Sequence, residues 1–205
     1  MIKRVFFFLL FLSASISFSQ NAVKSFFKLS RPEKCWVIFH PFAALKVMDL
    51  AGVATYRADS LKCDKTFDGD LNGGQLDAFR HAYWMALNVQ KISRKKAEKL
   101  GVKHEKGNYL DFKKRKNEDC TLPDSVSCAM DLFNNRAGLE IGLKNRGSSE
   151  QELVEAVKSE VLNGNLKKIK KDQHGNLIDC DGKLIEKEAF KAKWNSTKCL
   201  IKSNE

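Results

Sequence analysis

Several sequence signatures of well-known enzyme classes are missing from this 205-residue chain. It contains no Cys-x-x-Cys pair, which argues against a thiol redox motif and against a thiolate zinc knuckle. No Gly-x-Ser-x-Gly segment and no glycine-rich phosphate loop occur, so a serine-hydrolase elbow and a nucleotide-binding loop are not indicated. The compact His-Glu-x-x-His signature of zinc proteases is also absent.

Histidine is scarce as well, with four residues in the whole chain. His40 precedes Pro41 and His174 lies in a predicted turn, so both are expected to have structural or surface roles. His81 and His104 stand in segments that carry other polar side chains. These two are the candidates for metal binding or proton transfer.

The N-terminal apolar run, Val5 to Leu12, is too short to cross a bilayer as a stable helix. It follows the basic pair Lys3 and Arg4 and precedes a stretch of small residues, Ser13 to Ser19. This is the arrangement of a secretory signal peptide. We therefore predict that residues 1–19 are a signal peptide and that the mature protein is exported, either to the periplasm or out of the cell.

All six cysteines follow this segment, and an even number in an exported chain favours disulfides. Cys120 and Cys128 flank a turn-like segment and form the best candidate pair. Some of the six could instead be buried free thiols. A cysteine nucleophile is not expected in such a chain. The disulfide candidates are Cys35, Cys63, Cys120, Cys128, Cys180 and Cys199.

Negative charge is in short supply, because 25 acidic residues face 36 lysines and arginines and the net charge is +11. Residues 91–116 contain eleven of the basic residues and three acidic ones, so much of the excess lies there. Such a block favours an anionic lipid or another anionic surface as a partner, although a solvated lysine-rich face has the same composition. Specific nucleic-acid binding is not expected, and the oligomeric state is left open.

Hydrophobic periodicity predicts a mainly α fold with a single helical domain over residues 20–165. Pro41 is expected to break the first helical region. Ser93 is expected to cap a short lysine-rich helix that ends at Gly101. The predicted helices cover approximately residues 33–60, 75–90, 93–101, 125–145 and 150–163.

Residues 166–205 are predicted to form a small β-containing extension. Turn signals at residues 174–176 and 181–183 separate short strand-like pieces. These pieces indicate a hairpin or meander that Cys180 pins in place. The expected fold class is therefore mainly α with a minor β appendage, stabilised by disulfides.

The helix predicted over residues 75–90 is apolar in most directions, which is typical of a buried helix. At roughly 100° per residue, its polar residues fall within an arc of about 100° on one face. Burying charged groups is costly unless they are paired, hydrogen-bonded or bound to a metal. Another polar surface must therefore meet this face, which carries Asp77, Arg80, His81, Trp84 and Asn88.

The helix predicted to begin at Ser125 carries polar residues at matching spacings. Asp131, Asn134, Asn135 and Gly138 stand where Asp77, Arg80, His81 and Trp84 stand in the earlier helix. Two such faces packed together would bury a shared polar layer. Gly138 and Gly142 would leave room for Trp84 or for close helix contact.

His104 and Glu105 are predicted to lie just past a helix end, where a loop could bring them to this layer. The mixture of imidazoles, carboxylates and an amide suits Zn²⁺ if both histidines bind, and Mn²⁺ or Ca²⁺ if oxygens dominate. The metal-ligand candidates are Asp77, His81, His104, Asp131 and Asn135. The catalytic candidates are Glu105 as general base, with His81, His104 and Arg80. Trp84, Asn134 and Gly138 are expected to support the site.

The three blocks Asp-Ala-Phe-Arg-His-Ala-Tyr-Trp, His-Glu and Met-Asp-Leu-Phe-Asn-Asn-Arg-Ala-Gly resemble an uncharacterised bacterial domain family that is often exported. The resemblance covers about residues 70–165. It implies that the motif positions form a site. It brings no established reaction.

The sequence is therefore best interpreted as an exported helical protein with a polar site between helices. The expected function is that of a metal-dependent hydrolase acting on an anionic ester, either a phospholipid or a phosphodiester. Two alternatives stay open at this stage. One is a non-catalytic envelope or binding protein whose polar layer is structural, since buried polar networks can fix a helix register without chemistry. The other is a secreted antibacterial toxin.

Overall fold

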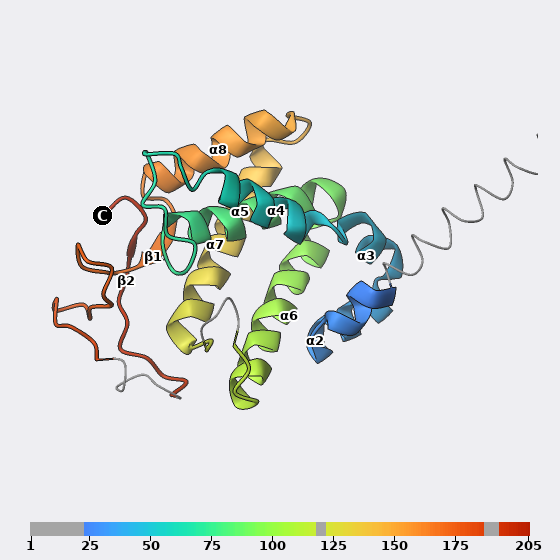
Figure 1. Ribbon diagram of the computed structural model, residues 1–205. Coiled ribbons are helices and arrows are strands. Elements are labelled where there is room, and N and C mark those ends of the chain that lie inside the picture. The colour runs from blue at the N-terminus through green and yellow to red at the C-terminus, as the bar shows by residue number, and fades with distance from the viewer. Residues whose placement is uncertain (1–22, 118–121, 187–192) are drawn as a thin grey trace, which may run out of the picture.

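The computed structural model describes residues 23–117, 122–186 and 193–205 (Figure 1). The predicted signal peptide and Cys120 lie outside the described residues. The fold is mainly helical, as predicted, and ends in a small two-stranded antiparallel sheet. Its elements are α2 (Arg31–Phe39), α3 (Pro41–Val47), α4 (Leu50–Ser60), α5 (Gln75–Lys91), α6 (Arg94–Lys113), α7 (Ser125–Lys144), α8 (Glu150–Leu162), β1 (Lys167–Ile169) and β2 (Leu200–Lys202).

Helix α5 lies at the centre of the fold, where it packs against α4, α6, α7 and α8 (Figure 1). Fourteen of its 17 residues are buried, which confirms the prediction of a buried helix. Its most extensive contact is with α7. A Cβ atom on Gly138 would lie 2.1 Å from the carbonyl oxygen of Ala82, and one on Gly142 would lie 2.5 Å from that of Ala86. The two glycines therefore permit close backbone contact between α5 and α7.

Helix α6 does not end at Gly101, so that prediction is wrong. It continues to Lys113, and His104 and Glu105 lie within the helix rather than in a loop. A Cβ atom on Gly101 would lie 3.4 Å from Asn135 Nδ2, and one on Gly107 would lie 2.4 Å from Ser30 Oγ. Both glycines allow neighbouring elements to pack closely against α6. From sequence alone, a glycine in this role cannot be distinguished from a glycine that ends a helix.

The N-terminal helices lie along α6 and α5. Helix α2 begins with a capping box in which Ser30 and Glu33 bond to each other's backbone N–H groups. The Trp36 indole donates a hydrogen bond of 3.2 Å to the carbonyl of Lys96 on α6. The chain breaks at His40 and Pro41, as predicted, and α3 starts there. No single helix among the described residues is long and apolar enough to cross a membrane. Taken together, α2 and residues 41–60 have the length and composition of a membrane span, but the chain bends by 114° between them.

The C-terminal segment returns to the helices instead of forming only a local hairpin. Strand β1 pairs with β2, which places Lys167 opposite Lys202. A disulfide between Cys180 and Cys199 closes this segment. Ser203, fully buried, donates from its hydroxyl to the carbonyl of Val161 and accepts at its own carbonyl from the Gln75 amide. The extension is thereby tied to the start of α5.

Two consecutive seven-residue units, Asp172–Ile178 and Asp179–Ile185, build the turns of the extension. In each unit the Asp carboxylate accepts hydrogen bonds from the backbone N–H groups two and four residues later. Gly175 and Gly182 have φ angles of 80° and 84°, which glycine adopts without strain. The repeated Asp-x-x-Gly-x-Leu-Ile pattern therefore produces the same turn twice.

The remaining cysteines differ in their surroundings. Cys35 and Cys63 are exposed and form no disulfide with another described residue. Cys128 is buried in α7. The predicted pair of Cys120 with Cys128 lies partly outside the described residues.

Candidate metal centre

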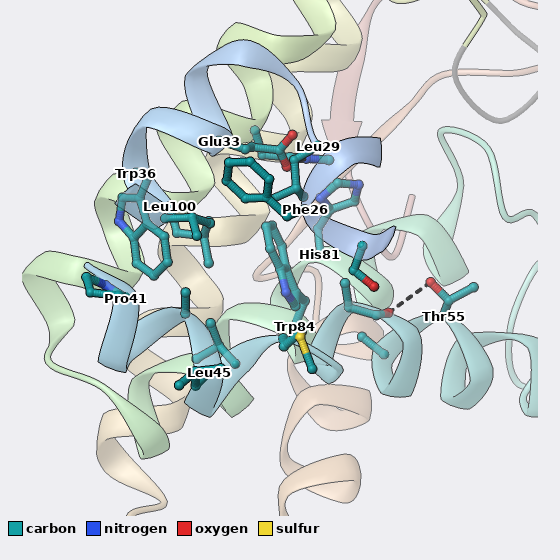
Figure 2. A pocket seen from close by; sticks show the side chains of 18 of the residues that line it. Phe26, Leu29, Glu33, Trp36, Pro41, Leu45, Thr55, His81, Trp84 and Leu100 are labelled. Atoms are coloured by element: carbon teal, nitrogen blue, oxygen red, sulfur yellow. Dashed lines mark hydrogen bonds and ion pairs between the residues drawn. The ribbon is translucent and has the colours of Figure 1, made fainter. Parts of the chain in front are cut away.

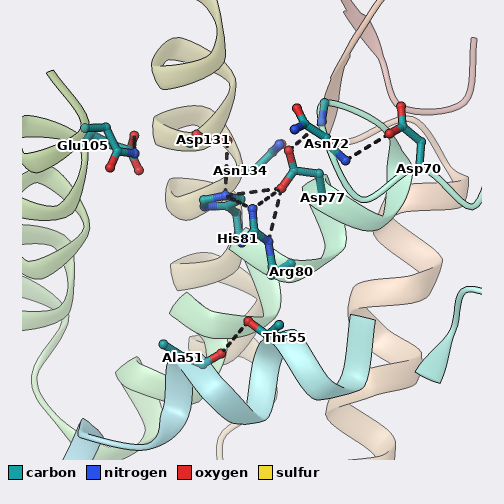
Figure 3. A network of polar contacts seen from close by, with 12 residues as sticks. Ala51, Thr55, Asp70, Asn72, Asp77, Arg80, His81, Glu105, Asp131 and Asn134 are labelled. Atoms are coloured by element: carbon teal, nitrogen blue, oxygen red, sulfur yellow. Dashed lines mark hydrogen bonds and ion pairs between the residues drawn. The ribbon is translucent and has the colours of Figure 1, made fainter. Parts of the chain in front are cut away.

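Asp77 and His81 on α5 meet Asp131 on α7 in a buried cluster (Figure 3). The candidate ligand atoms of these three residues all lie within 4.8 Å of one another. His81 Nε2 lies 3.3 Å from Asp131 Oδ1 and 3.5 Å from Asp77 Oδ1. Each residue is less than a tenth exposed. The shared polar face predicted for the two helices thus brings an imidazole and two carboxylates together.

Arg80 lies at the edge of the cluster and is partly exposed. Its Nη2 atom donates to Asp77 Oδ1 at 2.6 Å and lies 3.3 Å from His81 Nε2. The other carboxylate oxygen of Asp77 accepts a hydrogen bond of 2.7 Å from the N–H of Gly73. Two carboxylates against one guanidinium leave an excess of one negative charge, which a bound cation or a protonated His81 would neutralise.

A cavity of about 530 Å³ reaches this cluster from the side of the N-terminal helices (Figure 2). Its polar lining groups are few, and they include Glu33, Arg80, His81 and His104. Trp84, a residue expected to support the site, contributes an aromatic side chain to the lining. Apolar side chains from α2, α3 and α4 form most of the rest, among them Trp36, Val37, Ala44, Leu45, Val47, Met48 and Ala54. The arrangement is an apolar chamber with a charged end.

His104 lines this cavity but has a different partner from the one predicted. Its Nδ1 atom lies 2.9 Å from Glu33 Oε1, and its ring packs edge-on against Trp84 with the ring centroids 5.3 Å apart. Burial alone would raise the pKa of Glu33, but the hydrogen bond and charge of His104 and the bonds to Ser30 hold it below the ordinary value. Among the described residues, the cluster of Asp77, His81 and Asp131 does not include His104.

Glu33 was missed by the sequence analysis. The capping box Ser30-x-x-Glu33 would have located it at a helix start, but nothing in the spacing indicates a partner 71 residues away. Its carboxylate combines two tasks, because one oxygen accepts from the Ser30 N–H and the other faces His104.

Glu105 is buried in α6 and accepts a hydrogen bond of 3.1 Å from Asn108 Nδ2. It shares a helix face with Gly101, four residues earlier, where a Cβ atom would lie 3.4 Å from Asn135 Nδ2 of α7. Figure 3 shows it on the neighbouring helix, apart from His81. Glu105 is not among the residues that line the cavity.

The two asparagines of α7 have different surroundings. Asn134 exchanges two hydrogen bonds of 2.9 Å with the backbone of Lys167, so it fixes β1 to α7. Asn135 is 4% exposed, and neither atom of its amide has a hydrogen-bond partner among the described residues. A buried amide without partners is costly, so Asn135 is available to a ligand.

A scan against protein families matches residues 34–165 to a domain of unknown function, DUF6973. The chain belongs to this family. The matched part of the DUF6973 domain contains α5, α6 and α7 and therefore all three residues of the buried cluster. Glu33 and the C-terminal sheet lie outside the match. Neither the curated proteins nor the solved structures contain a match to this chain.

Proposed function

We propose that this DUF6973 protein is an exported, metal-dependent hydrolase that acts on an anionic ester. The observation that carries the proposal is the convergence of Asp77, His81 and Asp131 in a buried cluster, of which His81 lines an apolar cavity. A disulfide between Cys180 and Cys199 is in keeping with export, because disulfides persist in oxidising compartments.

Asp77, His81 and Asp131 are the proposed ligands of a divalent cation, and Asn135, one helical turn after Asp131, is a further candidate. With His104 engaged by Glu33, oxygen atoms dominate the set, which favours Mn²⁺ or Ca²⁺ over Zn²⁺. A metal in this position would supply an acidified water for hydrolysis.

The protein's own groups complete the chemistry. Arg80 lines the cavity next to the cluster, so its guanidinium can bind the anionic part of the substrate. His104 is the proposed general base, because it lines the cavity and Glu33 orients its ring. Glu105, the base expected from the sequence, does not line the cavity and is proposed instead to support Asn135 and Asp131 from α6.

The cavity lining favours a phospholipid over a phosphodiester without a hydrocarbon chain. Its walls are mainly apolar, and its volume of about 530 Å³ is within the range of small-molecule sites. An acyl chain would occupy the apolar part while the ester and its phosphate face Arg80 and His81.

Metal analysis of protein purified without a His tag tests this proposal. We expect close to one Mn²⁺ or Ca²⁺ per chain after loading, and hydrolysis of fluorogenic phospholipids. Asp131→Asn and His81→Ala should lose metal binding and hydrolysis. Glu140→Gln, which changes an exposed acid on the helix of Asp131, should keep both properties. A folded wild-type protein that binds no divalent cation and cleaves no phospholipid would refute the proposal.

One observation favours a second candidate, a non-catalytic protein whose polar layer is structural. Both oxygens of Asp77 already accept hydrogen bonds, from Arg80 and from Gly73. In that case the melting temperature would be the same with added metal and with a chelator, and Arg80→Ala would destabilise the fold by leaving Asp77 buried without its charge partner.

A further inference from the structure

The bend between α2 and α3 exposes large apolar side chains in an unusual concentration. Ile38, Phe39, Phe42 and Leu45 are 64%, 75%, 82% and 56% exposed, although they lie within eight consecutive positions. Single exposed apolar residues are ordinary, but a contiguous group of this kind marks a surface that contacts another apolar phase.

Helix α3 separates two hollows of the protein surface. Pro41, Ala44, Leu45 and Val47 line the cavity that leads to the candidate metal centre. The neighbouring positions on α3, which include Phe42, line a second hollow of about 570 Å³. One short helix therefore borders both the apolar chamber and this second hollow.

The second hollow, which we call the basic groove, is lined by four cationic side chains: Lys46, Lys91, Lys96 and Arg146. No carboxylate from the described part of the chain lines it. None of the four cations makes an ion pair with another described residue. Their charge is therefore available to an external anion.

The exposed face of α6 extends this positive surface. Lys95 and Lys99 are exposed on the same helix as Lys96. Trp36 bonds to the Lys96 carbonyl, which holds the end of α2 beside this part of α6. The apolar bend and the basic residues consequently lie next to each other.

We infer that the bend of α2 and α3 docks onto an anionic phospholipid surface. Phe39 and Phe42 enter the acyl region, and the cations of the basic groove bind headgroup phosphates. Charge complementarity identifies the occupant, because aromatic side chains flanked by unpaired lysines and arginines match a bilayer with apolar interior and anionic surface. The docking itself is independent of catalysis, but its use, delivery of an acyl chain past α3 into the cavity, rests on the proposed function.

Vesicle co-sedimentation of the full mature chain tests this inference. We expect binding to phosphatidylcholine vesicles that contain a quarter phosphatidylglycerol, little binding to phosphatidylcholine alone, and weakening by salt. Phe39→Ser with Phe42→Ser, and separately Lys91→Gln with Lys96→Gln, should each weaken binding about tenfold or more. All four side chains point to solvent or line the groove, so the variants should fold normally.

Matched control variants remove positive charges or an apolar side chain from surfaces outside the bend and the basic groove. Lys62→Gln with Lys65→Gln removes two exposed charges, and Leu184→Ser removes an exposed apolar side chain, and both should bind as the wild type does. Equal losses in controls and groove variants, or no binding to either vesicle, would overturn the inference. So would a dimer in light scattering that the Phe39 and Phe42 changes dissociate, since the bend would then contact a second copy.

The metal-site variant separates this inference from the proposed function. Asp131→Asn should keep vesicle binding while it loses metal and hydrolysis. Vesicle binding without hydrolysis by the wild type would leave docking intact and refute only the hydrolase. Hydrolysis of dispersed lipid without vesicle binding would refute only docking.

Discussion

At the scale of single residues, the environment of Asn135 is the strongest indication of a ligand at the candidate site. This side chain is buried and its amide has no partner among the described residues, whereas its neighbour Asn134 makes two bonds. Such a group lowers the stability of the protein unless a ligand satisfies it. Asn135 lies on α7 between Asp131 and the glycines that contact α5. We therefore expect this residue to favour ligand binding at the expense of the protein's stability.

Replacement of Asn135 by Leu, which branches at the same Cγ position but carries no polar atom, should therefore have two opposite effects. In the absence of metal the variant should be more stable to urea by about 1–3 kcal/mol, because the unsatisfied amide is gone. Its affinity for Mn²⁺ or Ca²⁺ should fall. Urea unfolding with a chelator and calorimetric metal titration measure the two quantities. A variant that is less stable and binds metal unchanged would show that Asn135 is structural.

The pair of Glu33 and His104 predicts a dependence of stability on pH. The pKa of Glu33 lies below its ordinary value of 4.5, so the folded protein binds this proton less readily than the unfolded chain. The contribution of Glu33 is therefore complete above about pH 4.5 and is lost as the pH falls through its lowered pKa. Glu33→Gln should flatten the fall in melting temperature below pH 4.5. Parallel melting curves for both proteins at pH 3 to 7 would contradict this.

At the scale of helices, the crossing of α5 and α7 depends on the absence of side chains at two positions. Gly138→Ala would place a Cβ atom 2.1 Å from the carbonyl oxygen of Ala82, which belongs to a helix backbone that cannot give way locally. We expect a loss of about 3 kcal/mol in the free energy of unfolding. Because this crossing sets the distance between His81 and Asp131, metal binding should weaken too.

Gly52→Ala is the matched control for this substitution. Gly52 lies within α4, and nothing would come within 4 Å of its Cβ atom. Alanine there should increase stability by about 0.5–1 kcal/mol, because it favours the helix. Urea unfolding of both variants checks the contrast. Equal effects at the two positions would mean that the α5–α7 contact tolerates a wider crossing.

The helices also show which features the sequence could and could not predict. The helices predicted over residues 125–145 and 150–163 are confirmed as α7 and α8, because caps and apolar periodicity act locally. Asp77, His81 and Asp131 converge because their helices present matching faces, which residue spacing can reveal. Gly101 was misread because a glycine at a helix contact and one at a helix end look the same in sequence. The partner of His104 depends on tertiary packing between α2 and α6, for which no local signal exists.

At the scale of the whole molecule, the disulfide of Cys180 and Cys199 closes a loop within the C-terminal extension. The two residues are separated by 19 positions, a span whose closure stabilises a fold by about 3 kcal/mol in the chain-entropy picture. Cys180→Ser with Cys199→Ser should lower the free energy of unfolding by an amount of this order. Cys35→Ser, at an exposed thiol, should leave it unchanged. Denaturation under non-reducing conditions gives both values, and an unchanged double variant would contradict the expectation.

The sequence predicted a disulfide-stabilised β appendage, but it did not predict which strands and which cysteines pair. Neighbouring pieces do form bridges, Lys171 with Leu177 and Ile178 with Leu184, but β1 pairs with β2, which lies beyond both turn units. Three-residue strands carry too little pattern to select a partner. Cys180 and Cys199 could have paired with any of the other cysteines, and only the packed fold brings them together.

The hydrogen bond between Gln75 and the carbonyl of Ser203 joins positions 128 residues apart. A chain that leaves the ribosome N-terminus first releases Gln75 roughly 6 to 25 seconds before Ser203, at translation rates of about 5–20 residues per second. During that interval the helix bearing Asp77 and His81 lacks this bond at its first turn and has only its local contacts there, such as that of Gly73 with Asp77. The nascent protein should therefore complete the geometry of the proposed cation site after translation of this span, and ribosome-bound fragments that stop short of β2 should remain sensitive to protease near residue 75.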